Sequence, residues 1–161
     1  MTTSKTIATT ASDPTVAAGS AQFLTPLVHS LQALVLNGKQ AHWHVRGANF
    51  VGVHELLDEV VAHAMDWADT AAERIVALGL PIDARASVVA AETGETAVPA
   101  AFASSDAMIH AVVADIDKIL AQTQEAIDGL DEIDLTSQDV AIEIRRGLEK
   151  DRWFLTAHVA A

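Results

Sequence analysis

The sequence predicts an all-α fold built as a four-helix bundle, and three observations favour it. Apolar residues recur at intervals of three and four along several long segments, which is the periodicity of an amphipathic helix. No segment shows the alternation of apolar and polar residues that is typical of a half-buried strand. Half of the 161 residues are apolar but only 4% are aromatic, and alanine is abundant, a composition that suits closely packed helices. This length predicts one domain with a substantial buried core.

The N-terminal residues 1–20 are rich in Thr, Ser and Ala and contain few large apolar side chains. We expect them to form a flexible arm, so that residues 21–161 make up the bundle domain. The first long helix is predicted to begin between Ser20 and Pro26, where a Thr-Pro pair suits a first turn, and to run to about Val45.

A second helix is predicted from Asn49 to Leu78, antiparallel to the first because only a short break separates them. Asn49 suits an N-cap, and Gly79 followed shortly by proline suits a helix end. Residues 81–104 then form a long connection. Within it, the segment after Asp83 indicates a short helix with an acidic cap.

The third long helix is predicted to begin at Ser105 and to end at Gly129. Thr136 to Asp139 resembles a capping box, which predicts the start of the fourth helix. Four long helices with a long crossing connection after the second are typical of the ferritin-like four-helix bundle.

The second predicted helix carries two pairs of candidate metal ligands. His54 and Asp58 are four residues apart, as are Asp69 and Glu73, and His42 lies just upstream. Residues four apart lie on one face of a helix, so the two side chains of each pair can bind the same metal ion. Imidazole suits iron, zinc or copper, and carboxylate suits harder ions, so the mixed set is iron-like without being specific to iron.

These pairs share one stripe of the helix, about 100° wide, with small or flexible apolar residues such as Ala62 and Met65. A bulkier stripe that includes Leu57, Val60 and Ile75 lies elsewhere around the helix, and we expect it to face the core. The ligand stripe therefore points away from the core, although it is too apolar to be left in water.

His54 and Asp69 cannot share an ion within one chain, because fifteen residues at about 1.5 Å each separate them by roughly 22 Å. An antiparallel copy of the helix, related by a two-fold axis near Ala62 to Met65, would cover the stripe. It would also bring Asp69 and Glu73 of the copy against His54. A two-fold interface is self-complementary, so it would form two such sites.

Other interpretations remain open for the same residues. Ordinary solvated side chains on a metal-free helical scaffold are one alternative. His63, which lies off the ligand stripe, is predicted to be solvated. A metal held by imidazole and carboxylate with an open position can also activate water, so a metal-dependent hydrolase of amides or esters is an alternative enzyme class.

The net charge of −12 argues against general affinity for DNA or for anionic membranes, and it favours cations. A DNA-binding and compacting protein is a further alternative, but Lys5 is the only basic residue of the N-terminal arm, so this role has no basic tail to support it. The absence of cysteine excludes disulfides, thiolate ligands and a thiol nucleophile. No apolar run is long enough to cross a bilayer, and no signal sequence is recognisable, so we expect a cytoplasmic protein.

Three segments resemble the Dps family of mini-ferritins: KQAHWHVRGANFVGVHELLDEV from Lys39, D-x-x-A-E-R from Asp69, and LEKDRWFLTAH from Leu148. The resemblance spans roughly residues 23–158. It implies a hollow shell of twelve four-helix subunits with di-iron ferroxidase sites at the two-fold interfaces. It also implies that Fe(II) is oxidised there, typically by hydrogen peroxide, and that ferric oxide is stored inside.

Carried over residue by residue, the resemblance makes His42, His54 and Asp58 ligands from one subunit, and Asp69 and Glu73 ligands from its two-fold mate. Trp43 matches the tryptophan beside the family's site. His44 departs from the family, where asparagine is common. It is read here as a partly exposed polar residue, with an added ligand or a proton shuttle as the alternative.

Acidic residues also gather around the junction between the third and fourth predicted helices. The resemblance implies that such residues line iron-entry pores at three-fold axes, whereas a solvated turn is the simpler reading. The candidates are Asp128, Asp131, Glu132, Asp134 and Asp139.

Overall fold

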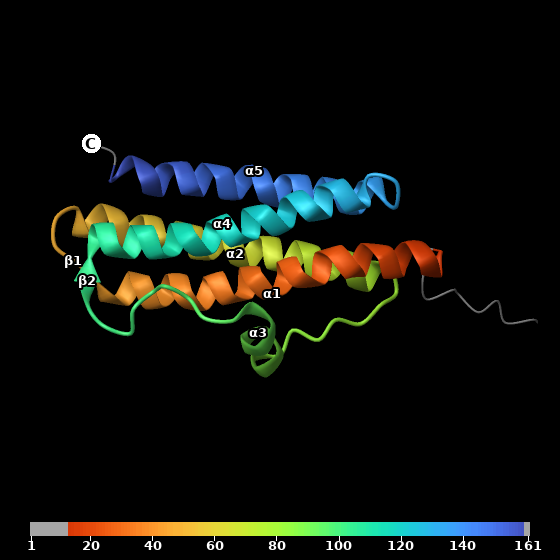
Figure 1. The fold of residues 1–161 in the computed structure, drawn as a ribbon, viewed down its shortest axis with the longest axis horizontal. Coiled ribbons are helices and arrows are strands. Elements are labelled where there is room, and N and C mark those ends of the chain that lie inside the picture. Colours follow the sequence, from red (N-terminus) through yellow and green to blue (C-terminus); the bar gives the residue numbers. More distant parts are fainter. Residues whose placement is uncertain (1–12, 160–161) are drawn as a thin grey trace, which may run out of the picture.

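A computed structural model describes residues 13–159, which form a four-helix bundle with one short additional helix in the connection between its two halves (Figure 1). The predicted all-α bundle, including the short helix, is confirmed. Two strands of two residues each, β1 and β2, pair in parallel at one end of the bundle. The elements in chain order are α1 (Pro14–His44), β1 (Val45–Arg46), α2 (Phe50–Ala77), α3 (Ala86–Thr93), β2 (Ala103–Ser104), α4 (Ser105–Leu130) and α5 (Leu135–Ala157).

Helix α1 begins earlier than the sequence predicted. The expected start between Ser20 and Pro26 is wrong, because the helix already begins at Pro14 and continues through Pro26. Asp13 caps it by accepting a hydrogen bond from the Thr15 backbone N–H at 2.8 Å. Ser20 is fully buried, so this first part of α1 packs against the bundle. The rest of the predicted arm, residues 1–12, lies outside the described residues.

The helix ends differ from the predicted caps in three further places. Asn49 precedes α2 as expected but has a left-handed φ of 58° and no side-chain capping bond. The cap of α3 is Arg85, and Asp83 instead accepts hydrogen bonds from its guanidinium group. The capping box expected at Thr136 is wrong by two residues, because Asp134 is the N-cap of α5.

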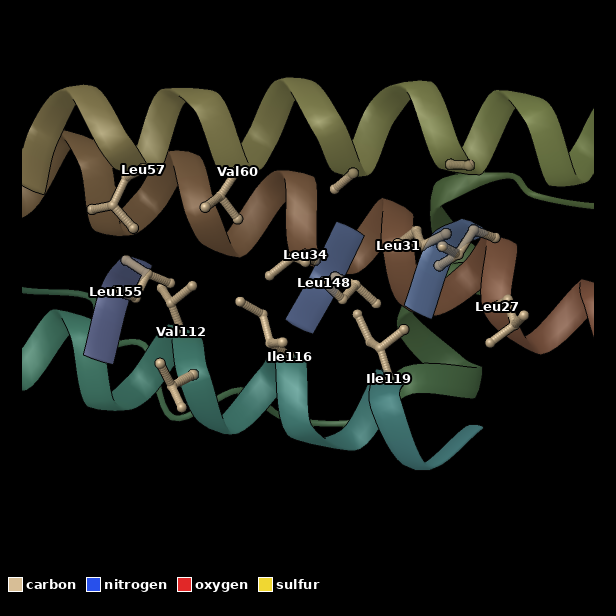
Figure 2. Packing of buried hydrophobic residues seen from close by; sticks show 14 of the residues in the cluster. Leu27, Leu31, Leu34, Leu57, Val60, Val112, Ile116, Ile119, Leu148 and Leu155 are labelled. Atoms are coloured by element: carbon tan, nitrogen blue, oxygen red, sulfur yellow. The ribbon is translucent and has the colours of Figure 1, made fainter. Parts of the chain in front are cut away.

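The core lies between all four long helices. The bulkier stripe of α2 faces it as predicted, since Leu57, Val60 and Ile75 have no exposed surface. Within residues 13–159, no helix is both long and apolar enough to span a bilayer. Figure 2 shows the core side chains pointing toward one another from α1 (Leu27, Leu31, Leu34), α2 (Leu57, Val60), α4 (Val112, Ile116, Ile119) and α5 (Leu148, Leu155).

The C-terminal half of α2 is anchored by Arg74. Its guanidinium group donates to the Asp134 carboxylate at 2.6 Å and to the Ser137 hydroxyl at 3.0 Å. The Ser20 hydroxyl donates to the same carboxylate at 3.3 Å. This network joins α2 to the beginning of α5 and to α1, and so sets the position of the helix that carries Asp69 and Glu73.

Candidate metal centre

Two imidazole rings are held together where α1 ends and α2 begins. His42 Nδ1 lies 2.8 Å from the main-chain oxygen of His54, and His54 Nδ1 lies 2.9 Å from the main-chain oxygen of His42. The ring centroids are 3.6 Å apart and the planes differ by 20°, so the rings are stacked. His42 is 8% exposed, whereas His54 is partly exposed.

These two hydrogen bonds decide which ring nitrogens can bind a metal. A carbonyl oxygen only accepts, so each Nδ1 must carry the hydrogen and donate it. Each Nε2 of a neutral ring then keeps its lone pair, which is the form in which histidine binds a metal ion. Such a fixed tautomer, set by a backbone carbonyl, is what metal-ligating histidines commonly show.

Asp58 adds a carboxylate to the imidazole pair. Its Oδ1 lies 3.5 Å from His42 Nδ1, and the same oxygen accepts a hydrogen bond from the Lys39 ammonium group. That hydrogen bond is the largest influence on the carboxyl group, and it lowers the pKa of Asp58 although burial acts in the opposite direction. Asp58 is therefore ionised at neutral pH, as a metal ligand must be.

The structure does not bring the other two predicted ligands to this place. Asp69 and Glu73 lie on the same helix, about 16 Å and 22 Å beyond Asp58 along its axis at about 1.5 Å per residue. Among residues 13–159, no group of three or more histidine and acidic side chains of one chain is placed to hold a metal ion. One subunit thus presents two separate parts of the predicted ligand set.

An uncovered apolar surface runs along α2 beside these parts. Met65 and Val76 on α2 are each 57% exposed, and Leu36 on α1 is 63% exposed. A groove between α1, α2 and α3 is lined by Leu36, Met65 and also Asp69, so a predicted ligand lies within this surface. Large apolar side chains gathered on one exposed face indicate a protein interface.

The ferritin-like domain family matches residues 22–161 of this chain. A solved structure of Dps from Microbacterium arborescens, in the high iron form, is 69% identical. It covers 96% of this chain and 100% of its own, with a TM-score of 0.92. The chain belongs to the Dps family.

Two curated relatives support membership of the Dps family. The DNA protection during starvation protein of Mycolicibacterium smegmatis is 34% identical over 146 residues, which cover 86% of this chain and 76% of the relative. The protein of the same name from Agrobacterium fabrum is 35% identical over 127 residues, which cover 78% of this chain and 78% of the relative. Membership of this ferritin-like family supports an iron-storage and protective function.

His44 and Trp43 do not join the imidazole pair of this Dps-family protein. His44 Nδ1 bonds to the main-chain oxygen of Gln40 at 2.8 Å, and its ring lies near Phe102. This placement favours the simpler reading of His44 as a partly exposed polar side chain. Trp43 is 63% exposed in the single chain.

The acidic junction between α4 and α5 contains side chains of two kinds. Asp134 caps α5 and pairs with Arg74, so it has a structural role and is not free for a pore. Asp128 and Asp131 accept hydrogen bonds from neighbouring glutamines, Gln124 and Gln138. Exposed Glu132 and Asp139 remain as pore candidates.

Lys39 is the residue of this site that sequence reasoning missed. It lies three residues before His42 on α1 and so shares its face, a spacing that was visible in the sequence. Only the packing of α1 against α2 places its ammonium group on Asp58.

Proposed function

We propose that this protein oxidises Fe(II) at sites shared by two-fold-related subunits, preferably with hydrogen peroxide. Ferric oxide would then be stored in a hollow shell of twelve subunits. Each site would take His42, His54 and Asp58 from one subunit and Asp69 and Glu73 of the partner subunit. We place this activity in the cytoplasm, as a protection against oxidative stress.

The observation that carries the proposal is the reciprocal pair of hydrogen bonds between His42 and His54. Each ring is fixed by the other residue's carbonyl group, so neither imidazole has to be reoriented when an Fe(II) ion arrives. Neither Nε2 atom is used by these hydrogen bonds, and the Asp58 carboxylate lies 3.5 Å from Nδ1 of His42. Nitrogen and oxygen ligands of this kind suit iron.

The exposed apolar stripe of α2 supports the shared nature of the site. An antiparallel copy of α2 would cover Met65 and would place an acidic pair opposite an imidazole pair at both ends of the contact. The carboxylates of Asp69 and Glu73 would then balance the charge of the bound ions. A shared site of this kind would account for the lack of a complete ligand set among residues 13–159 of one subunit.

The chemistry requires two Fe(II) ions for each peroxide. Each Fe(II) gives up one electron, the O–O bond of hydrogen peroxide accepts both electrons, and two hydroxide ions form. The reaction consumes Fe(II) and peroxide together, and these are the two reactants that otherwise generate hydroxyl radicals. The net charge of −12 per chain supports attraction of the incoming cation.

Replacement of two ligands tests the proposal directly. The double variant His54→Ala with Asp58→Ala should lose fast Fe(II) oxidation, because both a fixed imidazole and the adjacent carboxylate are removed. Oxidation is followed by the absorbance of the ferric product after mixing with peroxide, and assembly is followed by size-exclusion chromatography.

The matched control is Glu55→Ala with Glu59→Ala, which removes two exposed side chains at the same spacing from a different face of α2. It should keep the initial oxidation rate. Unchanged kinetics in the His54 and Asp58 variant would show that iron is oxidised elsewhere and would end the assignment.

A further inference from the structure

The ammonium group of Lys39 forms a hydrogen bond with the carboxylate of Asp58, a proposed metal ligand. Lys39 Nζ is bonded to Asp58 Oδ1, the oxygen that also lies 3.5 Å from His42 Nδ1. The Lys39 side chain is 36% exposed and that of Asp58 is 47% exposed, so the pair lies at the edge of the site and within reach of an incoming ion.

We propose that Lys39 is a tethered competitor cation, which holds Oδ1 of Asp58 in the metal-free subunit and must be displaced before a divalent ion binds to that oxygen. This inference rests on the proposed function, because it takes Asp58 to be a metal ligand. It assigns to Lys39 a positioning role that sets metal affinity, and no direct part in the oxidation.

The competition follows from the chemistry of the groups. A lysine ammonium has three donors and no acceptor, so it can bind a carboxylate but cannot ligate a metal ion. A divalent ion that binds Oδ1 must displace the ammonium group from that oxygen, and an ion that binds Oδ2 instead is repelled by the positive charge beside it. After displacement, the flexible stem keeps the positive charge close to the bound ion, and the repulsion between them lowers the affinity further.

Competition from Lys39 should weaken metal binding at Asp58 but not at the two imidazoles. The Nε2 atoms of His42 and His54 have no such competitor, because their rings are held through Nδ1. An ion bound mainly by the imidazoles should therefore bind more tightly than one that depends on Asp58. Weak binding at Asp58 suits a place that iron must leave for the store.

The contact is not explained by a role in stability. Ion pairs between partly exposed side chains contribute little to folding, because water screens them and long side chains lose conformational freedom. Lys39 should therefore be replaceable without loss of the fold or of the assembly.

The experiment is a calorimetric titration of the full-length assembled protein with Zn²⁺, which binds imidazole and carboxylate but is not oxidised. Lys39→Met keeps much of the stem and removes the charge. We expect the weaker binding step to become about tenfold tighter, an order-of-magnitude figure for removal of one partly screened charge. The number of ions bound should not change.

Lys118→Met is the matched control, because Lys118 also pairs with an aspartate, Asp115 at 3.3 Å, but does so on α4. It removes the same charge and should leave the Zn²⁺ affinities unchanged. Equal affinities in the Lys39→Met protein and the wild type, or a gain of the same size in both lysine variants, would overturn the inference.

Asp58→Asn separates this failure from a failure of the proposed function. If Asp58→Asn weakens Zn²⁺ binding while Lys39→Met changes nothing, the metal site stands and the role of Lys39 is wrong. If Asp58→Asn also changes nothing, the ion binds elsewhere and both proposals fall.

Discussion

At the scale of single residues, Asp151 holds a carboxyl group almost out of contact with water. It is 2% exposed, and both of its carboxylate oxygens lie 3.1 Å from His63 Nδ1. Burial raises the pKa of Asp151, and nearby Glu59 raises it further, although His63 and Lys150 act in the opposite direction. His63 was predicted to be solvated, but it is half-exposed and bound to this buried acid.

The raised pKa gives Asp151 a defined effect on stability. Its folded pKa lies above the unfolded value of 3.8, so the folded chain favours the neutral acid. The stabilisation is fully present below the unfolded pKa and is lost as the pH rises through the folded pKa. Each unit of elevation corresponds to about 1.4 kcal/mol.

Asp151→Asn should remove the loss of stability that accompanies ionisation of Asp151 at rising pH. Asparagine cannot ionise, and its side-chain oxygen can still accept a hydrogen bond from His63. Relative to the wild type, the variant should gain thermal stability as the pH rises through that window. Unfolding midpoints of both proteins, measured from about pH 4 to pH 8, test this. A constant difference between the two proteins at every pH would contradict it.

At the scale of the helices, Asp134 connects three elements at one end of the bundle. Burial raises its pKa, but hydrogen bonds from Ser137, Arg74 and the Thr136 backbone outweigh that effect, and the net pKa is lowered. The stabilisation from this carboxylate is therefore present above the unfolded pKa of 3.8 and is lost as the pH falls through the folded value.

Asp134→Ala should lower the free energy of unfolding by about 2 kcal/mol, because it removes the N-cap of α5 and leaves the partly buried Arg74 without its carboxylate. Asp139→Ala is the control, since it replaces an exposed aspartate on the same helix and should change stability by less than about 0.5 kcal/mol. Denaturant titration of both variants gives the comparison, and equal losses would mean that the network contributes no stability.

At the scale of the whole molecule, the apolar face of α1 and α2 decides whether a ligand set can be completed. Its exposed side chains lie on the surface that also carries Asp69 and Glu73. If a second subunit covers this face, assembly and chemistry are coupled, because the same contact that buries the apolar surface also delivers the missing carboxylates.

Met65→Asp tests this coupling. The substitution places two negative charges near the proposed two-fold axis, so the subunit pair should dissociate. Fast Fe(II) oxidation should be lost with it, although no ligand has been replaced. Analytical ultracentrifugation and peroxide-driven oxidation are measured on the same samples. Met65→Leu keeps the face apolar and should preserve both properties. Dissociated subunits that still oxidise iron at the normal rate would contradict a shared site.

The sequence alone determined the features that depend on helical periodicity. Four long amphipathic segments, the core-facing stripe with Leu57, and the spacing of His54 from Asp58 are all local patterns, because side chains four apart must share a face. Helix ends were less predictable. Asp13 and Asp134 each cap a helix through a local backbone N–H, but the burial of Ser20 and the bond from Arg74 to Asp134 are contacts with distant segments that local patterns do not reveal.

Only the tertiary structure decided how these patterns meet. The tautomers of His42 and His54, the position of Lys39 on Asp58 and the pairing of His63 with Asp151 all join different helices. Spacing within one helix fixes direction around its own axis but not the rotation or offset of the neighbouring helix. Those depend on how the whole core packs.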